Sequence, residues 1–251
     1  MSLLSPDLIL SVFLVFCRIG ACLMLMPGFA SLRVPTQVRL FVVLGATFAL
    51  APVVTPTILP VVANASNPGL LALVLTEILI GAQIGVIGRI FYLALQTMAH
   101  ASTMLIGFAP MPGAVIDEME PIPPLSSLVM LSATALLFIT NLHWEIFRGL
   151  VISYETIPLL TGFDPRLALV GLSDRIGEAF LLALRIASPF VVFAFLANFA
   201  LGVMNKLAQQ IPIYFVALPA VLFAGLIVFY FLAGEFLALF VAGFADWLRT
   251  G

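Results

Sequence analysis

Charged side chains are scarce in this sequence. Asp, Glu, Lys and Arg make up 9% of its 251 residues, whereas hydrophobic residues make up 63%. Soluble domains carry roughly 25% charged and about 45–50% apolar residues, because a folded surface needs polar cover. The composition therefore excludes a soluble domain and predicts an integral membrane protein. The net charge of −2 provides no basic stripe, which argues against binding to nucleic acid or to a membrane surface alone.

Metal-ligating and catalytic patterns are also missing from the sequence. The two cysteines, Cys17 and Cys22, lie five positions apart in one apolar segment, a spacing that suits neither a disulfide nor a metal pair. We expect both to be buried apolar residues. No second His or Cys lies near His143, and there is no phosphate-binding loop or Ser/His/Asp arrangement. We therefore expect no metal, no cofactor and no enzymatic activity.

Long apolar segments are what the sequence does contain. A bilayer core requires about 20 apolar residues of helix, so these segments predict one all-α membrane domain over residues 1–251. The expected segments are 8–26, 38–54, 70–95, 125–142, 181–207 and 211–247. The first lacks a basic region before it, so we expect it to be retained rather than cleaved.

Proline and segment length give two further expectations about these helices. Pro52, Pro56 and Pro60 are expected to be turn signals that follow the second segment. The last segment is too long for one straight span, and we expect it to bend or fold back as a hairpin.

Arginines in the loops do not follow the positive-inside rule if all six segments span the membrane. Either one segment is not a span, or the helices are not ordinary transmembrane helices.

The third segment carries a glutamate followed by small residues. Glu77, Gly81 and Gly85 recur every fourth residue, and Gly88 follows three positions later. Residues four apart share one helix face, so this face predicts close packing against a neighbouring helix that satisfies Glu77. Proton or ion chemistry at Glu77 is the alternative.

Other ionisable residues also lie inside apolar segments. Arg18, Arg185 and Glu235 are costly in lipid, so we expect them to face protein or water and to contribute to helix packing and assembly. We expect Glu235 to be buried. Because these residues and Glu77 have no evident partners within the chain, partner subunits are expected to satisfy them.

The segment 107–124 is both apolar and rich in proline. A regular helix cannot pass through its prolines, yet its hydrophobic side chains are unusual for a solvated linker. It is either an ordinary connector or a segment that lines or blocks a passage. The candidate residues for blocking a channel are Gly107, Phe108, Ala109, Pro110, Met111, Pro112, Gly113 and Met119.

Several short patterns, taken in order along the chain, resemble the FliR family of flagellar biosynthesis proteins. They are Arg18-Ile19-Gly20 with Met26-Pro27, Pro35 and Arg39; Glu77-Ile78-Leu79-Ile80-Gly81 with Ile84-Gly85; Ser153-Tyr154 with Pro158; Ala187-Ser188-Pro189; Leu201-Gly202; Asn205-Lys206; and Pro212 before Tyr214-Phe215-Val216. Each pattern is weak alone, but their order and spacing cover nearly the whole chain.

This resemblance implies a protein export gate in the bacterial inner membrane, at the flagellar basal body. Such a gate contains the sister subunits FliP and FliQ, is contacted by FlhB, and passes unfolded substrates through kinked helical hairpins wound into a helical assembly. The resemblance also implies that 107–124 is the plug of the export channel. The alternatives are the homologous subunit of a virulence type III secretion system, a secondary transporter, and a purely structural assembly scaffold.

Overall fold

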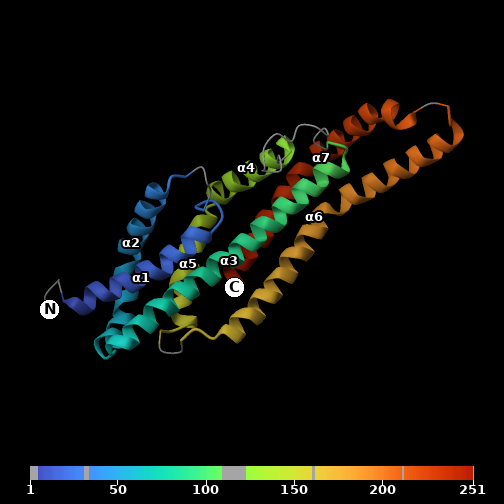
Figure 1. Ribbon diagram of the computed structural model, residues 1–251. Helices are drawn as coiled ribbons and strands as arrows, with labels where there is room; N and C mark the ends of the chain where they lie inside the picture. Colours follow the sequence, from blue (N-terminus) through green and yellow to red (C-terminus); the bar gives the residue numbers. More distant parts are fainter. Residues whose placement is uncertain (1–4, 31–33, 109–122, 160–161, 211, 251) are drawn as a thin grey trace. The chain divides into compact units, whose positions relative to one another are not determined.

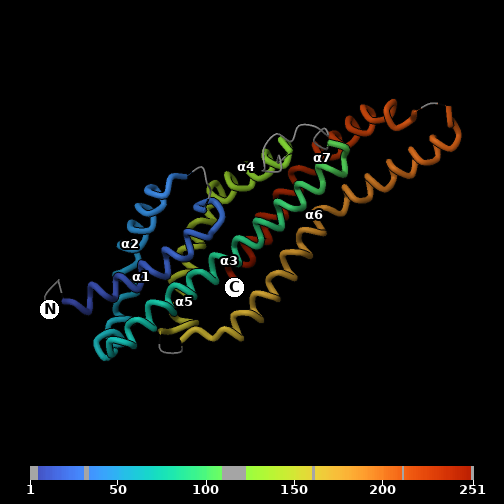
Figure 2. The backbone as a smooth tube through the Cα atoms, in the orientation of Figure 1, coloured from blue at the N-terminus to red at the C-terminus, as the bar shows by residue number. Residues whose placement is uncertain are grey.

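The computed structural model describes residues 5–30, 34–108, 123–159, 162–210 and 212–250, and these residues form helices and their connections (Figure 1). The path of the chain is followed most easily in Figure 2. The helices are α1 (Pro6–Leu25), α2 (Thr36–Ala63), α3 (Asn67–Leu105), α4 (Pro124–Ile139), α5 (Leu142–Thr156), α6 (Pro165–Leu207) and α7 (Ile213–Thr250).

Most of these helices have the length and apolar character that a membrane span requires. Among the described residues five helices qualify alone, namely α1, α2, α3, α6 and α7. The pair α4 and α5 qualifies as a sixth, broken span. The prediction of an all-α, multi-pass membrane protein is confirmed.

The start of α1 follows from its local sequence. The Ser5 hydroxyl accepts a hydrogen bond from the Leu8 amide, Pro6 occupies the first turn, and Asp7 places a negative charge near the helix N-terminus. Each feature stabilises that end, because the first amides of a helix lack partners and carry partial positive charge.

The expectation that three prolines end the second helix is wrong. Pro52, Pro56 and Pro60 all lie inside α2, which continues to Ala63. All three prolines are exposed, so their rings do not collide with the packed face of the helix. At the C-terminus of α2 the Asn64 side-chain amide donates to the Pro60 carbonyl at 2.8 Å and so satisfies one of the last carbonyls of the helix, which lack intrahelical partners.

The last two helices are also longer and more continuous than expected. α6 begins at Pro165, well before the expected apolar segment, and passes through Pro189 without a break. α7 passes through Pro219 and does not fold back as a hairpin. The charged residues near the start of α6 hid that part of the helix from a search for apolar segments.

The chain divides into two compact units. The first contains residues 1–92, 140–177 and 245–251. Its core includes Leu14, Ile19, Ile58 and Leu150, all fully buried, and Trp247 near the end of α7 stacks on Phe91 of α3 with ring centroids 5.6 Å apart.

The second unit contains residues 93–139 and 178–244. Its core is aromatic: Phe190 of α6 is fully buried and meets Phe229 and Phe236 of α7 at centroid distances of 6.1 and 6.3 Å. Aromatic pairs at such distances add to the stabilisation from burial alone.

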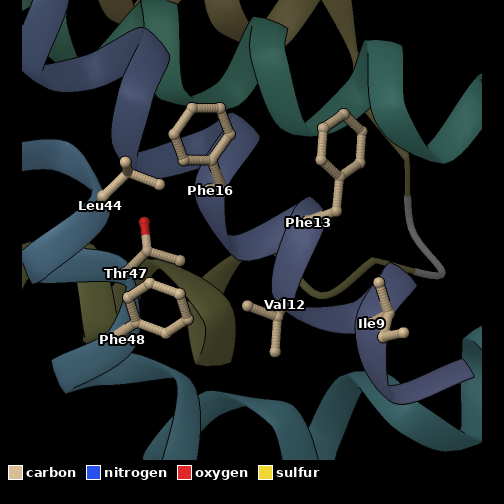
Figure 3. Close-up of a pocket in the computed structure, with 7 residues that line it drawn as sticks. All are labelled: Ile9, Val12, Phe13, Phe16, Leu44, Thr47 and Phe48. Carbon is tan, nitrogen blue, oxygen red and sulfur yellow. The ribbon is translucent and has the colours of Figure 1, made fainter. Parts of the chain in front are cut away.

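An apolar pocket of about 270 Å³ lies between α1 and α2 in the first unit (Figure 3). It is lined by Ile9, Val12, Phe13, Phe16, Leu44, Thr47 and Phe48. The hydroxyl of Thr47 donates to the Val43 carbonyl at 2.7 Å, so the polar group on this wall is already satisfied. The pocket therefore suits hydrocarbon and offers no polar recognition.

A glycine on α7 gives a test of packing in the second unit. A Cβ at Gly225 would lie 2.5 Å from the Cβ of Ile106 on α3, whereas a Cβ at Gly234 would meet open space. Overpacking costs about 1–3 kcal/mol, and replacing a helical glycine by alanine gains up to about 1 kcal/mol. We expect Gly225→Ala to unfold at a lower temperature in detergent than its control, Gly234→Ala, by about 1–3 kcal/mol in stability. Equal melting curves would contradict this packing.

Candidate functional site

A buried ion pair joins α1 to α3 in the first unit. Arg18 donates from Nε to Oε2 of Glu77 at 2.9 Å and from Nη2 to Oε1 at 2.6 Å. Both side chains are fully buried. The planar guanidinium thus meets both carboxylate oxygens at once, the strongest geometry available to an Arg–carboxylate pair.

Helix α5 completes the surroundings of Arg18. Nη1 donates to the Ser153 hydroxyl at 3.1 Å, and Nη2 also donates to the Ile157 carbonyl at 3.3 Å. The Ser153 hydroxyl donates its proton to the Leu150 carbonyl, so the Ser153 oxygen accepts the hydrogen bond from Arg18. The Tyr154 ring lies 3.8 Å from the guanidinium carbon, a cation–π contact.

These contacts correct one expectation from the sequence. Arg18 and Glu77 were expected to need partner subunits, but each is satisfied by the other within this chain. Every nitrogen of the guanidinium has an acceptor. The arrangement is suited to holding three helices together rather than to moving a proton, because both charges are already paired and shielded from water.

Glycines on α3 allow this pair to form. A Cβ at Gly81 would overlap the carbonyl oxygen of Arg18, and a Cβ at Gly85 would lie 2.6 Å from that of Cys22. A Cβ at Gly88, one turn further along α3, would meet the flexible end of the Met26 side chain. The backbones of α1 and α3 approach so closely along this face that only glycine fits at Gly81 and Gly85.

The other two predicted packing residues lie elsewhere. Arg185 on α6 and Glu235 on α7 belong to the second unit, and both side chains are exposed. The expectation that Glu235 is buried is wrong. It lies on α7 away from the face that buries Phe236, Phe240 and Phe244, so the chain itself does not cover it.

Only the two ends of the predicted plug segment are described. Ala109, Pro110, Met111, Pro112, Gly113 and Met119 lie outside the described residues. At the near end, Gly107 has a φ of +84° and ends α3. Its amide donates to the Met104 carbonyl, and the amide of the half-buried Phe108 donates to that of Thr103. This paired hydrogen bonding after a left-handed residue is a Schellman motif, which stops the helix.

A buried hydrogen bond closes the segment at its base in the second unit. The hydroxyls of Thr103, in the last turns of α3, and Ser126, in the first turn of α4, lie 3.0 Å apart. Thr103 also donates to the Ala99 carbonyl at 2.7 Å, which leaves Ser126 as the donor to Thr103. We call Thr103 and Ser126 the neck. Sequence reasoning missed it, although a hydroxyl on each side of the loop was a visible signal.

Across the described ranges, no group of three or more His, Cys, Asp or Glu side chains is placed to hold a metal ion. The geometry of the described residues defines a class: a multi-pass helical membrane protein with an internally satisfied ion pair and a hydroxyl contact between the end of α3 and the start of α4. A sequence model of the bacterial export proteins, family 1, matches residues 9–247.

Individual relatives agree with this match. The chain is 30% identical to the flagellar biosynthetic protein FliR of Caulobacter vibrioides over 215 residues, covering 85% of this chain and 84% of the relative. It is 27% identical to FliR of Escherichia coli over 213 residues (83% and 78%) and 26% identical to FliR of Aquifex aeolicus over 230 residues (89% and 85%). The chain belongs to family 1 of the bacterial export proteins, the FliR family. The resemblance seen in the sequence is confirmed.

The ion pair can be tested by comparing single with double substitutions. Removing one partner of a buried pair leaves an unpaired charge and costs about 3–5 kcal/mol, whereas replacing both by apolar residues of similar volume is often neutral. We expect Arg18→Met and Glu77→Leu each to destabilise the first unit strongly, and the double variant to recover most of the loss. Thermal unfolding of the purified protein in detergent measures all three. Additive losses would show that the two residues are not coupled.

Proposed function

We propose that this chain is a subunit of the flagellar type III protein export gate in the bacterial inner membrane and is required for flagellum assembly. The observation that carries the proposal is the family match, which spans residues 9–247 and therefore nearly every described helix. The relatives compared above are flagellar biosynthetic proteins and are matched over most of their own length. The multi-pass helical fold suits the membrane location.

Its partners in this proposal are the sister subunits FliP and FliQ, with FlhB in contact and unfolded flagellar proteins as substrates. The helices leave many large apolar side chains exposed, for example Phe195 and Phe215. Exposed apolar surface on such a scale needs lipid or protein cover. The role is that of a channel subunit, without catalysis.

The segment 107–124 acts as the plug of the channel. Its support in the structure is the way its ends are held: the Schellman motif stops α3 at Gly107, and the neck joins the base of the loop. The described ends of the segment are thus held together, and the prolines in its sequence exclude a regular helix.

The chemistry of this loop suits a gate. Apolar side chains such as Phe108, Met111 and Met119 exclude water and ions from a narrow passage, because a dewetted constriction blocks conduction without a perfect steric seal. Methionine is flexible enough to close around different substrates. A passing chain displaces such a loop without unfolding α3 or α4, because the neck lies outside it.

The partner assignment is tested by purification. A tagged chain extracted in mild detergent is expected to recover FliP and FliQ in fixed ratios, and a strain that lacks the gene is expected to make no flagella. A chain that restores flagella but recovers neither sister subunit would contradict the proposed partners.

The plug is tested by ion leakage. Replacing Phe108, Met111 and Met119 by Ser is expected to make the membrane leak small ions while the export complex still assembles, because the apolar constriction is lost. The control is Met104→Ser, an exposed residue of α3 that lies before the loop. Conductance of the assembled complex in planar bilayers measures the leak. Equal conductance of the triple variant and the control would favour a structural scaffold without a plug.

A further inference from the structure

One face of α6 in the second unit is exposed and largely apolar, and it carries Arg185, with Ser188 beside it and Glu178 nearer the start of the helix. Helical spacing places Leu181, Val192 and Phe199 on the same face as Arg185. Leu181 is 66% exposed and Phe199 is 65% exposed. The opposite face buries small residues and Phe190 against the rest of the unit. The outward face, defined here by Leu181, Arg185, Val192 and Phe199, is left without cover by the described chain.

Arg185 is the feature that distinguishes this face from a surface made only for lipid. The described part of the chain contains no ion pair of Arg185. The acidic residue on the same face, Glu178, lies two turns earlier, about 10 Å along the helix axis, beyond direct contact. An arginine surrounded by exposed apolar side chains is costly in a bilayer unless a counter-charge meets it.

The first unit of the same chain shows how an arginine on an apolar helix is stabilised by an acidic partner. Arg18, also on an apolar helix, is paired through Nε and Nη2 with a glutamate from a second apolar helix. That pair lies inside the first unit. Arg185 has the same donors but faces outward, and no ion pair among the described residues supplies its acceptor.

We propose that the outward face of α6 docks a membrane helix of a sister subunit, and that this helix carries a carboxylate at the level of Arg185. The apolar side chains on either side supply contact area, and the ion pair fixes the register of the two helices. The proposal rests on the proposed function and adds the surface and the recognising charge to it.

The experiment compares three variants in the assembled export gate. Arg185→Met keeps the apolar length but leaves the partner carboxylate unpaired, and Arg185→Glu opposes it with a like charge. The control is Arg166→Met, an exposed arginine of the first turn of α6. We expect the tagged Arg185→Met chain to recover about tenfold less FliP and FliQ, because the partner carboxylate is left unpaired; tenfold corresponds to about 1.4 kcal/mol. Arg185→Glu is expected to recover still less, and the control as much as wild type.

Three further results separate docking from a folding defect and from contact with lipid. Because Arg185 is exposed, its variants are expected to keep the membrane level and melting temperature of the wild-type chain, whereas a loss of both would overturn the docking role of this residue. A photo-cross-linker at Val192 is expected to capture a sister subunit, and capture of lipid alone would overturn the proposal. Restoration of the Arg185→Glu complex by an acidic-to-basic change in FliP or FliQ would support it.

The outcomes also distinguish this inference from the proposed function. If the wild-type chain recovers neither sister subunit, the proposed function is wrong. If the wild-type chain recovers both and Arg185→Met recovers them equally well, only the docking face is wrong, and Arg185 is met by lipid headgroups or water.

Discussion

The pairing of Arg18 with Glu77 is the constraint on which the first unit depends. Neither charge is tolerable in an apolar interior alone, so α1 and α3 must lie close enough for direct hydrogen bonds. That distance in turn requires glycine where α3 meets the backbone of α1. The remaining donors of the guanidinium then require α5, whose Ser153 supplies a hydroxyl, and Ile157 just after it, which supplies a carbonyl oxygen. One pair of charges thus determines which three helices pack together and at what distance.

The apolar surroundings also determine how the helices themselves behave. Proline ends helices in water because the freed carbonyl finds water and an alternative backbone path costs little. In a helix made for lipid, leaving the helical path would expose several unsatisfied backbone groups at once. This explains why α2, α6 and α7 all continue through proline. At the end of α2, the side-chain amide of Asn64 donates to the Pro60 carbonyl. Where the chain does leave the helix, at Gly107, the amides of Gly107 and Phe108 donate to carbonyls of the last turn that would otherwise lack partners.

Sequence reasoning reached the helical class, the approximate position of the spans and the glycine face of α3, because each depends on periodicity or composition within one segment. It did not pair Arg18 with Glu77, since 59 residues separate them and the pairing depends on how the helices pack. It placed Glu235 in the interior because it treated every charge in an apolar helix alike. It also missed the neck, because the hydroxyls of Thr103 and Ser126, although visible on either side of the loop, follow no periodic pattern that pairs them.

The two units differ in whether their ionisable side chains are paired within the unit. In the first unit a positive and a negative side chain satisfy each other, so that unit contains what it needs to hold its helices together. In the second unit Arg185 and Glu235 are both exposed on helices that carry mostly apolar side chains. An ionisable residue in such a position is retained at a cost that the isolated chain does not recover. In the proposed docking, another chain supplies the opposite charge at Arg185, so this part of the second unit serves assembly rather than the folding of the chain itself.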